Sequence, residues 1–429
     1  MTGEWSTKHF EQMAQLVKDT VNPSEAIGVP YVALEHIGQG SLSLLGTGVA
    51  EDAISLKNRF RQGDILFGKL RPYFRKMIRS SFEGVCSTDI WVVRPRPGVD
   101  AGFLFYLMAS DLFLEPVVRS SQGTKMPRAQ WEYASLLELP MPPINIQRAI
   151  AHILGTLDDK IELNRRMNET LEQMAQALFK AWFVDFEPVR AKLEGRWQRG
   201  QSLPGLPAHL YDLFPDAMDG DVPQGWRKDN IFEIADLMGG GTPSTSNPDY
   251  WNGNIYWVSA KDVSNVTGAF ILQTEKTISE LGVKNSSTRI LPIKATIVTA
   301  RGTVGACCLL GKEMAMNQTN YGFVSKDRTY PYFVFFSLLS IVRQLRQHSY
   351  GTIFDTITTK TFQNILCILP SATIIYKFEE LITPFMDLVL RNQHELLTLS
   401  RLRDTLLPNL ISGKLRVKEA ERFLKEAGV

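Results

Sequence analysis

Residues 145–183, NIQRAIAHILGTLDDKIELNRRMNETLEQMAQALFKAWF, decide the fold of this chain. Apolar residues recur in them at alternating spacings of three and four, which predicts one long helix with a coiled-coil seam. The seam positions are Leu154, Leu157, Ile161, Asn164, Asn168, Leu171, Ala175, Leu178 and Trp182. Such a stripe requires a partner helix to cover it.

The partner pattern lies 228 residues further along the chain. Every seam position maps at this constant offset onto a second series: Ile382, Phe385, Val389, Asn392, Leu396, Leu399, Arg403, Leu406 and Leu410. Asn164 maps onto Asn392, and a buried Asn weakens a seam but fixes its register. We predict that the two helices pair in an antiparallel coiled coil with these two Asn residues in its core. Two unrelated surface helices are the alternative.

The repeat extends beyond the helices. Matched segments occur in the same order in both halves, at offsets between 221 and 231 residues. They are residues 5–17 and 226–238, 31–37 and 257–263, 64–68 and 295–299, 103–107 and 332–336, 121–124 and 349–352, and 139–140 and 369–370. Strands are expected early in each half and helices late, which is typical of an α+β fold. We predict two homologous globular domains, related by a pseudo-two-fold axis and joined by the two long helices.

The domain boundaries follow from this plan. We assign residues 1–144 to the first domain, 145–186 to the first long helix, 187–225 to a linker rich in Pro and Gly with little periodic structure, 226–375 to the second domain, and 376–429 to the second long helix and tail. Pro408 is expected to end or kink the last helix. A helix of ~30 residues is about 45 Å long, a little over one turn of DNA, so it suits a target with two separated parts.

Composition limits the possible classes of protein. The 429 residues are 44% hydrophobic and 21% charged with a net charge of +2, which indicates a folded protein whose nucleic-acid surface, if present, is local. The four cysteines form no CxxC pair, so neither a zinc site nor a disulfide framework is expected. The first residues lack the apolar core of a signal peptide, and the longest apolar run, 330–342, is too short to span a bilayer. We expect a cytoplasmic protein that does not associate with membranes.

The clearest sign of a partner is the basic segment 57–79, KNRFRQGDILFGKLRPYFRKMIR. Eight of its residues are basic, Asp64 is its one acidic residue, and aromatic residues are interleaved. Lys and Arg neutralise phosphates, and Arg can pair bidentately with guanine in the major groove. The segment is therefore a candidate nucleic-acid surface. A solvated charged face beside a buried strand is the alternative.

Loops after apolar helices supply further candidates in both halves. Ser121-Gln-Gly-Thr-Lys125 resembles Ser349-Tyr-Gly-Thr352, with Gly for close backbone approach and Thr for hydrogen bonds to phosphate or base edges. An ordinary glycine helix cap is the alternative. Basic residues are sparser in the second half, where Lys261, Arg289, Lys294, Arg301 and Lys312 occur. Two similar domains with different polar side chains would read two different sequences.

Enzyme motifs fail on inspection. Asn247-Pro-Asp-Tyr250 departs at Asp249 from the site of amino-methyltransferases, and residues 305–312 have the wrong spacing for a phosphate-binding loop. Asp158-Asp-Lys160 resembles part of a nuclease site but lies on the heptad helix, where charges normally face solvent. We expect no catalytic residue, no metal ligand and no cofactor on this chain.

Several loose motifs together resemble one family, the specificity subunits of type I restriction-modification systems. They are WFVDFEPVRAK (182–192), LFPD (213–216), GGGTPS (239–244), YWNG (250–253), LRDTLLP (402–408) and LISGK (410–414). The resemblance covers essentially the whole chain. The first half departs from the pattern because it opens without the GGGTP stretch.

The resemblance implies that each globular half is a target-recognition domain that reads one part of a bipartite double-stranded DNA site. The paired helices would set the spacer and dock two methyltransferase subunits, which bind S-adenosylmethionine and methylate adenine N6. Restriction subunits would add ATP- and magnesium-dependent translocation and cleavage. Base flipping by the methyltransferase would expose the adenine.

Candidate residues combine the repeat with this chemistry. For the first half-site we predict Lys69, Arg71, Arg75, Lys76, Gln122 and Lys125, and for the second Lys261, Arg301, Thr303, Gln318 and Thr352. Arg301 takes roughly the place of Leu70 in the repeat. For helix pairing we predict Leu154, Leu157, Ile161, Asn164, Leu171, Leu178, Ile382, Phe385, Val389, Asn392, Leu399 and Leu406. Two other hypotheses stay open: a stand-alone DNA-modifying enzyme, and a coiled-coil adaptor that binds only proteins.

Overall fold

The computed structural model describes residues 5–52, 55–123, 125–301, 303–348 and 356–426. The chain divides into two compact units, and both long helices contribute to each of them. Unit 1 comprises Met1–Leu163 and Leu397–Val429, and unit 2 comprises Asn164–Leu396. Each unit therefore contains one globular domain and half of each long helix.

Unit 1 is an α+β domain with two main sheets. Its strands are β1 (Ser6–His9), β2 (Ala14–Val17), β3 (Thr20–Val21), β4 (Pro30–Val32), β5 (Gly48–Val49), β6 (Lys57–Phe60), β7 (Ile65–Gly68), β8 (Met77–Arg79), β9 (Gly84–Cys86), β10 (Ile90–Pro95) and β11 (Glu138–Met141). Its helices are α1 (Phe10–Met13), α2 (Ala101–Ala109), α3 (Asp111–Arg119), α4 (Trp131–Ser135), α12 (Val417–Glu426) and parts of α5 (Ile144–Phe183) and α11 (Ala372–Ile411). The sheet orders are β2-β10-β7-β8 and β3-β6-β9-β4-β5, and β1 pairs with β11.

Unit 2 repeats this plan. Its strands are β12 (Met218–Asp219), β13 (Val222–Pro223), β14 (Arg227–Asn230), β15 (Ala235–Gly239), β16 (Trp251–Val258), β17 (Phe270–Ile271), β18 (Lys276–Ile278), β19 (Ile290–Leu291), β20 (Thr296–Thr299), β21 (Cys307–Leu310), β22 (Met314–Met316), β23 (Asn320–Ser325) and β24 (Leu366–Leu369). Its own helices are α6 (Glu187–Leu193), α7 (Ala260–Ser264), α8 (Glu280–Lys284), α9 (Pro331–His348) and α10 (Thr359–Asn364). The sheet orders are β15-β23-β20-β21-β17 and β18-β16-β22-β19, and β14 pairs with β24.

The main strands of the two topologies correspond, which confirms the predicted duplication. The order β2-β10-β7-β8 recurs as β15-β23-β20-β21. The parallel pair β4–β9 recurs as β16–β22, and the closing pair β1–β11 recurs as β14–β24. The segments matched in the sequence, such as 64–68 with 295–299, are the equivalent strands β7 and β20.

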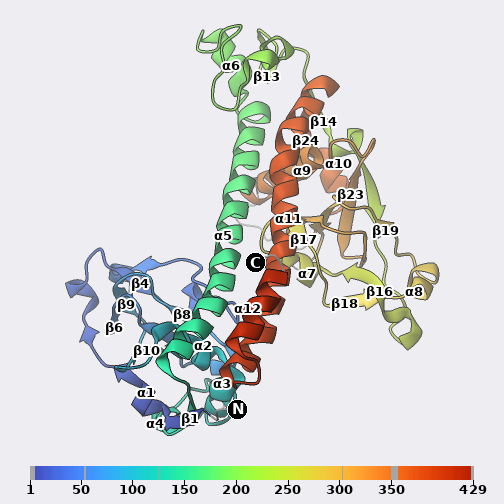
Figure 1. The fold of residues 1–429 in the computed structure, drawn as a ribbon. Helices are drawn as coiled ribbons and strands as arrows, with labels where there is room; N and C mark the ends of the chain where they lie inside the picture. Colours follow the sequence, from blue (N-terminus) through green and yellow to red (C-terminus); the bar gives the residue numbers. More distant parts are fainter. Residues whose placement is uncertain (1–4, 53–54, 124, 302, 349–355, 427–429) are drawn as a thin grey trace. The chain divides into compact units, whose positions relative to one another are not determined.

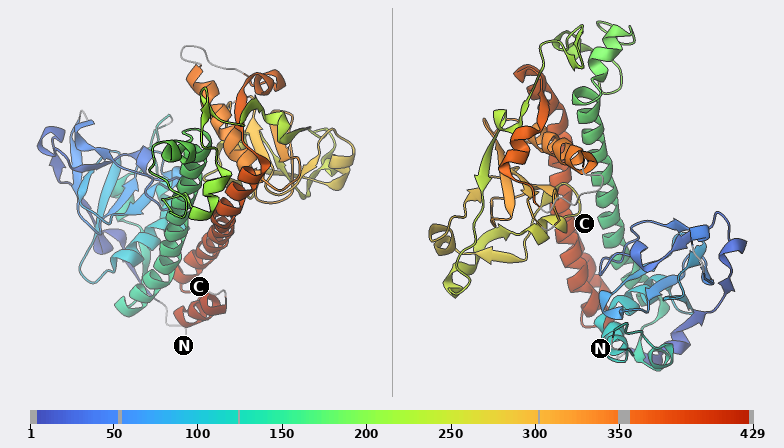
Figure 2. Two further views of the ribbon diagram at one scale, coloured as in Figure 1. Left: turned by 90° about the horizontal axis from the view of Figure 1, so that it is seen from above. Right: turned by 180° about the vertical axis from the view of Figure 1, so that it is seen from behind.

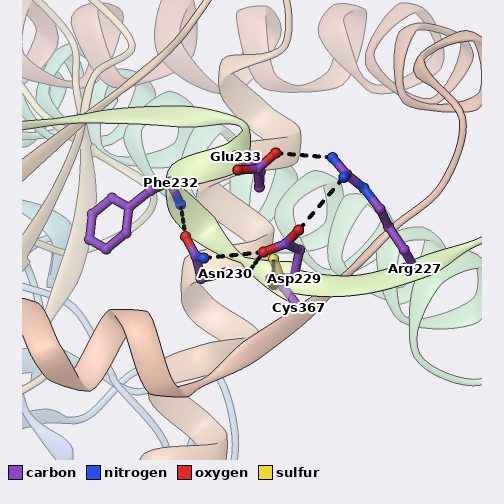
Figure 3. Close-up of polar contacts among 6 residues, drawn as sticks. All are labelled: Arg227, Asp229, Asn230, Phe232, Glu233 and Cys367. Atoms are coloured by element: carbon purple, nitrogen blue, oxygen red, sulfur yellow. Dashed lines mark hydrogen bonds and ion pairs between the residues drawn. The ribbon is translucent and has the colours of Figure 1, made fainter.

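Short polar contacts order the start of the second domain, and one of them joins it to β24 near the end of that domain (Figure 3). Arg227 at the start of β14 forms ion pairs with Asp229 and Glu233, at 3.6 and 3.1 Å. The Cys367 thiol of β24 donates a hydrogen bond to the Asp229 carbonyl oxygen at 3.3 Å, and the Asn230 side chain accepts one from the Phe232 backbone N–H at 3.0 Å. These contacts fix the β14–β24 pair from which α11 then begins.

The long helices supply the core of each unit. In unit 1, α2 packs against the first half of α5, where a methyl group at Gly102 would lie only 2.8 Å from the Ala151 Cβ (Figure 1). In unit 2, the second half of α5 and the first half of α11 run side by side (Figures 1 and 2). Phe179, Phe183 and Phe378 form an aromatic cluster between them, with ring centroids 5.1 to 5.7 Å apart.

Two expectations about the chain's connections need correction. Residues 187–225 hold α6 and a 3-10 helix, and Trp197 and Phe214 within them are buried, so the segment packs onto the end of α5. Its Pro and Gly residues shape turns but do not prevent apolar packing. Of the two effects expected of Pro408, an end of the helix is not found: α11 continues to Ile411 and is followed by Gly413 with a φ of 75°.

Among the described helices, none by itself combines the length and apolar character needed to cross a membrane. The bent pair of α2 and α3, joined at 53°, passes that test by length and composition.

Candidate nucleic-acid interface

In the first domain, the end of β7 and the loop before α4 are held together by backbone hydrogen bonds. The Ala129 N–H donates to the Lys69 carbonyl oxygen at 2.9 Å, and the Arg71 N–H donates to the Pro127 carbonyl oxygen at 2.7 Å. The Lys69 N–H in turn donates to the Asp89 carbonyl oxygen at 2.9 Å. The predicted residues Lys69 and Arg71 therefore lie beside the predicted loop at 121–125.

That loop is itself closed by a short antiparallel bridge. The backbone groups of Gln122 and Arg128 exchange two hydrogen bonds, at 2.9 and 3.0 Å, and leave the side chains of Gln122 and Lys125 exposed. Arg128 forms an ion pair with Asp89 at 3.1 Å. Sequence reasoning missed Arg128, although its place three residues after Lys125 in a basic loop was a usable signal.

Lys69 and Arg71 have the electrostatic character that phosphate binding requires. Within the described part of the chain, neither side chain pairs with a carboxylate, and both are partly exposed. Arg71 has a φ of 50°, a left-handed conformation that is strained for a residue with a side chain and occurs often at functional sites.

Other residues of the basic segment have partners within the protein. Arg75 forms an ion pair with Asp111 at 2.7 Å, and the Lys76 ammonium donates to the Leu34 carbonyl oxygen at 2.6 Å. Lys57 is buried, and desolvation lowers its pKa. The alternative of a structural role beside a buried strand therefore describes Lys57 and Lys76 better than contact with DNA does.

The second domain reproduces the same framework with different side chains. The Ala300 N–H donates to the Thr319 carbonyl oxygen and the Ile357 N–H donates to the Ala300 carbonyl oxygen, both at 2.9 Å. These bonds match those of Lys69 in the first domain, so Ala300 is the counterpart of Lys69 and Arg301 that of Leu70. The same backbone hydrogen-bond arrangement therefore holds the loop of Lys69 in the first domain and the equivalent loop of Arg301 in the second.

The predicted residues of the second half are distributed unevenly around this frame. Arg301 and Thr303 are exposed in the β20–β21 connection, and Gln318 is exposed in the β22–β23 turn, where it accepts a hydrogen bond from the Thr242 hydroxyl. Lys261 is exposed on α7 but forms an ion pair with Glu275 at 2.7 Å. Thr352 and its loop lie outside the described residues.

Two glycines of the Gly-Gly-Gly-Thr-Pro stretch, Gly240 and Gly241, lie too close to their neighbours for larger residues. A Cβ at Gly240 would lie 2.0 Å from the Asn317 carbonyl oxygen, and one at Gly241 would lie 2.3 Å from the Ser287 hydroxyl. The Gly241 N–H donates to the Met316 carbonyl oxygen at 3.0 Å. The stretch thereby supports the turn that carries Gln318.

In unit 1, the predicted pairing residues of both helices enter one core. Leu154 and Leu157 of α5 are buried with Leu399 and Leu406 of α11, and Ile161 packs at the edge. Asp158 also faces inward, where it accepts hydrogen bonds from the Tyr106 hydroxyl at 2.7 Å and the Arg403 guanidinium at 2.9 Å. The expectation that charges of Asp158-Asp-Lys160 face solvent is thus wrong for Asp158. Burial raises its pKa, and the charge of Arg403 opposes that rise.

In unit 2, the predicted leucine and valine contacts of the seam are present. Leu171, Leu178, Ile382 and Val389 belong to one core cluster. Phe385 is only half-buried, and its neighbour Met386 is fully buried instead. At this point of α11 the side chain of Met386, and not that of Phe385, faces the core.

Asn164 and Asn392 are both buried between the helices of unit 2, but their side chains bond to other partners and not to each other. The Asn392 amide donates to the Asn168 side-chain oxygen at 2.9 Å, and the Asn164 amide donates to the Glu395 carboxylate at 2.9 Å. As the residue numbers of the contacts rise in α5, from Asn164 to Asn168, those of their partners in α11 fall, from Glu395 to Asn392. The helix halves of unit 2 are therefore antiparallel. Equivalent positions of a repeat do not face each other in such a pair, except at its centre.

The motifs that resemble enzyme sites have structural roles. The Asn247 side chain accepts a hydrogen bond from the Asp249 N–H at 3.1 Å and so shapes a turn, and the Trp251 indole donates to the Ser244 carbonyl oxygen at 3.1 Å. No group of three or more His, Cys, Asp or Glu side chains is arranged for a metal ion within the described ranges.

Comparison with known proteins agrees with the duplicated frame. The model of the family described as "Type I restriction modification DNA specificity domain" matches residues 4–173 and 223–398. The type I restriction enzyme HindI specificity subunit of Haemophilus influenzae is 31% identical over 406 residues, which cover 84% of this chain and 88% of the relative. The MjaIX specificity subunit of Methanocaldococcus jannaschii is 26% identical over 93% of this chain and 87% of its own length.

A solved structure has the same fold. The crystal structure of the type I restriction-modification system S subunit from M. genitalium aligns with a TM-score of 0.58 at 15% identity, over 95% of this chain and 96% of that one. The family model matches both halves separately and covers most of the chain. The chain therefore belongs to the family of type I restriction-modification DNA specificity subunits.

Proposed function

We propose that each globular domain reads one part of a bipartite DNA site. The observation that carries this proposal is that the two domains share one backbone framework. The equivalent loops of this framework carry Lys69 in the first domain and Arg301 in the second. Because the two backbones are alike, the two domains would dock on the DNA duplex in the same way. Because their side chains differ, they would prefer different bases. Lys69, Arg71, Gln122 and Lys125 contact the first half-site, and Arg301, Thr303 and Gln318 the second.

The two long helices fix the number of base pairs between the half-sites. Their antiparallel contacts within unit 2 and their shared core within unit 1 support this role. The helices also dock two methyltransferase subunits, which carry S-adenosylmethionine and transfer its methyl group to adenine N6. The relatives' names as specificity subunits support this division of labour, in which the present chain is not itself catalytic.

Restriction subunits that use ATP and magnesium join the same assembly in the cytoplasm and cleave unmethylated DNA. The chain itself binds no cofactor in this proposal. Its partly buried Asp158 is engaged by Tyr106 and Arg403, so this carboxylate has a structural role in the helix pair of unit 1.

The test is methylation profiling of DNA by single-molecule sequencing, in a host that carries the methyltransferase partner with or without this chain. One bipartite N6-methyladenine motif should appear only when both are present. Replacement of the domain at 226–375 by the corresponding domain of a relative should change one half of the motif and leave the other. Methylation at an undivided motif, or methylation by this chain alone, would contradict the proposal.

A further inference from the structure

The loop at residues 267–269 in unit 2 is held by both long helices at once. The Glu172 carboxylate of α5 accepts a hydrogen bond from the Ala269 N–H at 2.8 Å. The Gln393 amide of α11 donates to the Thr267 carbonyl oxygen at 3.1 Å. Gly268 lies between these two contacts, so three consecutive residues of the recognition domain are fastened from two sides.

The environment of Gly268 is fitted closely to this arrangement. Its φ is +92°, a conformation that glycine adopts at little cost. A Cβ at this position would lie 2.6 Å from the Gln393 amide nitrogen and 3.1 Å from a Glu172 carboxylate oxygen. Both helices therefore approach the bare backbone of the loop, which a side chain would prevent.

The two clamping side chains are largely removed from solvent. Gln393 is 8% exposed, and its amide oxygen has no hydrogen-bond partner among the described residues. Burial raises the pKa of Glu172, and the bond from the Ala269 N–H opposes that rise. Burying polar groups is costly unless their hydrogen bonds are made, so the contacts are specific rather than incidental.

The loop leads directly to the proposed reading surface. It continues into β17, which pairs in parallel with β21, and the Leu309 N–H donates to the Ala269 carbonyl oxygen at 2.8 Å. Strand β21 pairs with β20, and the connection between them carries Arg301 and Thr303. One short path of backbone hydrogen bonds thus joins the helix pair to the reading loop.

We propose that Glu172 and Gln393 are positioning residues that fix the orientation of the second recognition domain on the helix pair and thereby restrict the spacer of the DNA site. The bond of Glu172 comes from α5 and the bond of Gln393 comes from α11. A shift of one helix along the other would therefore break one of the two bonds. The Asn168–Asn392 pair lies one turn from Glu172 and next to Gln393, and it holds the two helices in the register that the clamp requires. The inference rests on the proposed function.

The experiment uses the chain co-produced with its methyltransferase subunit, and duplex targets that contain the wild-type motif with its own spacer or with one base pair more or fewer. The measured quantity is the ratio of methylation at altered spacers to methylation at the natural spacer. In Glu172→Ala/Gln393→Ala this ratio should rise about tenfold, the effect of roughly two lost hydrogen bonds, while the half-site sequences stay the same.

Matched variants separate positioning from general stability. Glu172→Gln keeps an acceptor of the same length and should restore the wild-type ratio. Glu169→Ala, one turn away on the exposed side of the helix, should not change the ratio.

Gly268→Ala should raise the ratio, whereas Gly40→Ala should not. Gly40 lies in the first domain and also has a positive φ of +66°, but open space surrounds the site of its Cβ.

An unchanged ratio in the double variant, an equal effect of Gly40→Ala, or uniform loss of methylation at every spacer in a folded complex would overturn the inference. Gly268→Ala and the single variant Glu172→Ala decide the question if the double variant does not fold. Absence of bipartite methylation with the wild-type chain would instead contradict the proposed function, so the two failures are distinguishable.

Discussion

The Asn392 side chain donates a hydrogen bond to the side-chain oxygen of Asn168 at 2.9 Å, between the two long helices of unit 2. Both residues are at most 5% exposed. A buried amide pair in a mostly apolar seam disfavours every register in which one amide would face an aliphatic side chain. This pair therefore favours one register of the two helices in unit 2.

Replacing one member of this pair should cost more than replacing both. Asn392→Leu leaves the Asn168 amide buried without its partner and should lower the free energy of unfolding by roughly 1–3 kcal/mol. Asn168→Leu/Asn392→Leu should be neutral or stabilising, because both polar groups are removed together. Urea denaturation of the two single variants and the double variant measures the coupling. Additive effects would show that the hydrogen bond contributes nothing.

Removal of Arg403 should destabilise unit 1. Arg403→Met leaves Asp158 buried without its cationic partner, and breaking a buried pair in this way costs about 3 kcal/mol or more. Arg401→Met changes an exposed arginine on the same helix and should have little effect on the urea midpoint. Equal midpoints for the two variants would show that the Asp158–Arg403 contact does not support the fold.

Loss of Lys69 and Arg71 should weaken DNA binding in a salt-dependent way. Each phosphate contact removed lowers the slope of log K against log salt by about one, so Lys69→Ala/Arg71→Ala should lower it by about two. Arg75→Ala is the control, because the Arg75 guanidinium already pairs with Asp111. Fluorescence anisotropy of the methyltransferase complex on its target duplex, at several salt concentrations, gives the slopes. An unchanged slope in the double variant would place the first half-site elsewhere.

Glu379 should make the stability of unit 2 depend on pH. Its carboxylate accepts hydrogen bonds from the Tyr332 and Phe333 N–H groups at the start of α9, at 3.1 and 3.0 Å, and burial raises its pKa from 4.5 to about 7. Between these values the native state keeps a proton that the unfolded state has released. The contribution of Glu379 to stability is therefore full below pH 4.5 and lost as the pH rises through 7, by ~3 kcal/mol in total.

The measurement compares the wild-type chain with Glu379→Gln by urea denaturation between pH 5 and pH 8. The variant should gain stability relative to the wild type as the pH rises. Glu380→Gln is the control: the ion pair with Lys377 lowers the pKa of Glu380, so this carboxyl is ionised in both the native and the unfolded state across the range, and its difference from the wild type should not change with pH. A pH-independent difference for Glu379→Gln would show that this carboxyl titrates normally in the native state.

Much of the candidate interface was predictable from the sequence. Lys69, Arg71, Gln122 and Lys125 were chosen from two separate segments, and backbone hydrogen bonds at Lys69 and Arg71 bring those segments together. The internal partners of Arg75 and Lys76 were not predictable. Asp111 and the Leu34 carbonyl oxygen lie far away in the sequence, and only the folded sheet and helices bring them near.

The sequence by itself determined the duplication, the two long helices and the family. Periodicity and constant offsets survive in the order of residues, because each repeat must bury the same faces. The tertiary structure alone decided which residues of the two helices meet. Antiparallel packing pairs Asn392 with Asn168 instead of its repeat equivalent Asn164, and it brings Glu172 and Gln393 to the same loop around Gly268. Such contacts depend on the direction and register of packing, which a repeat pattern does not encode.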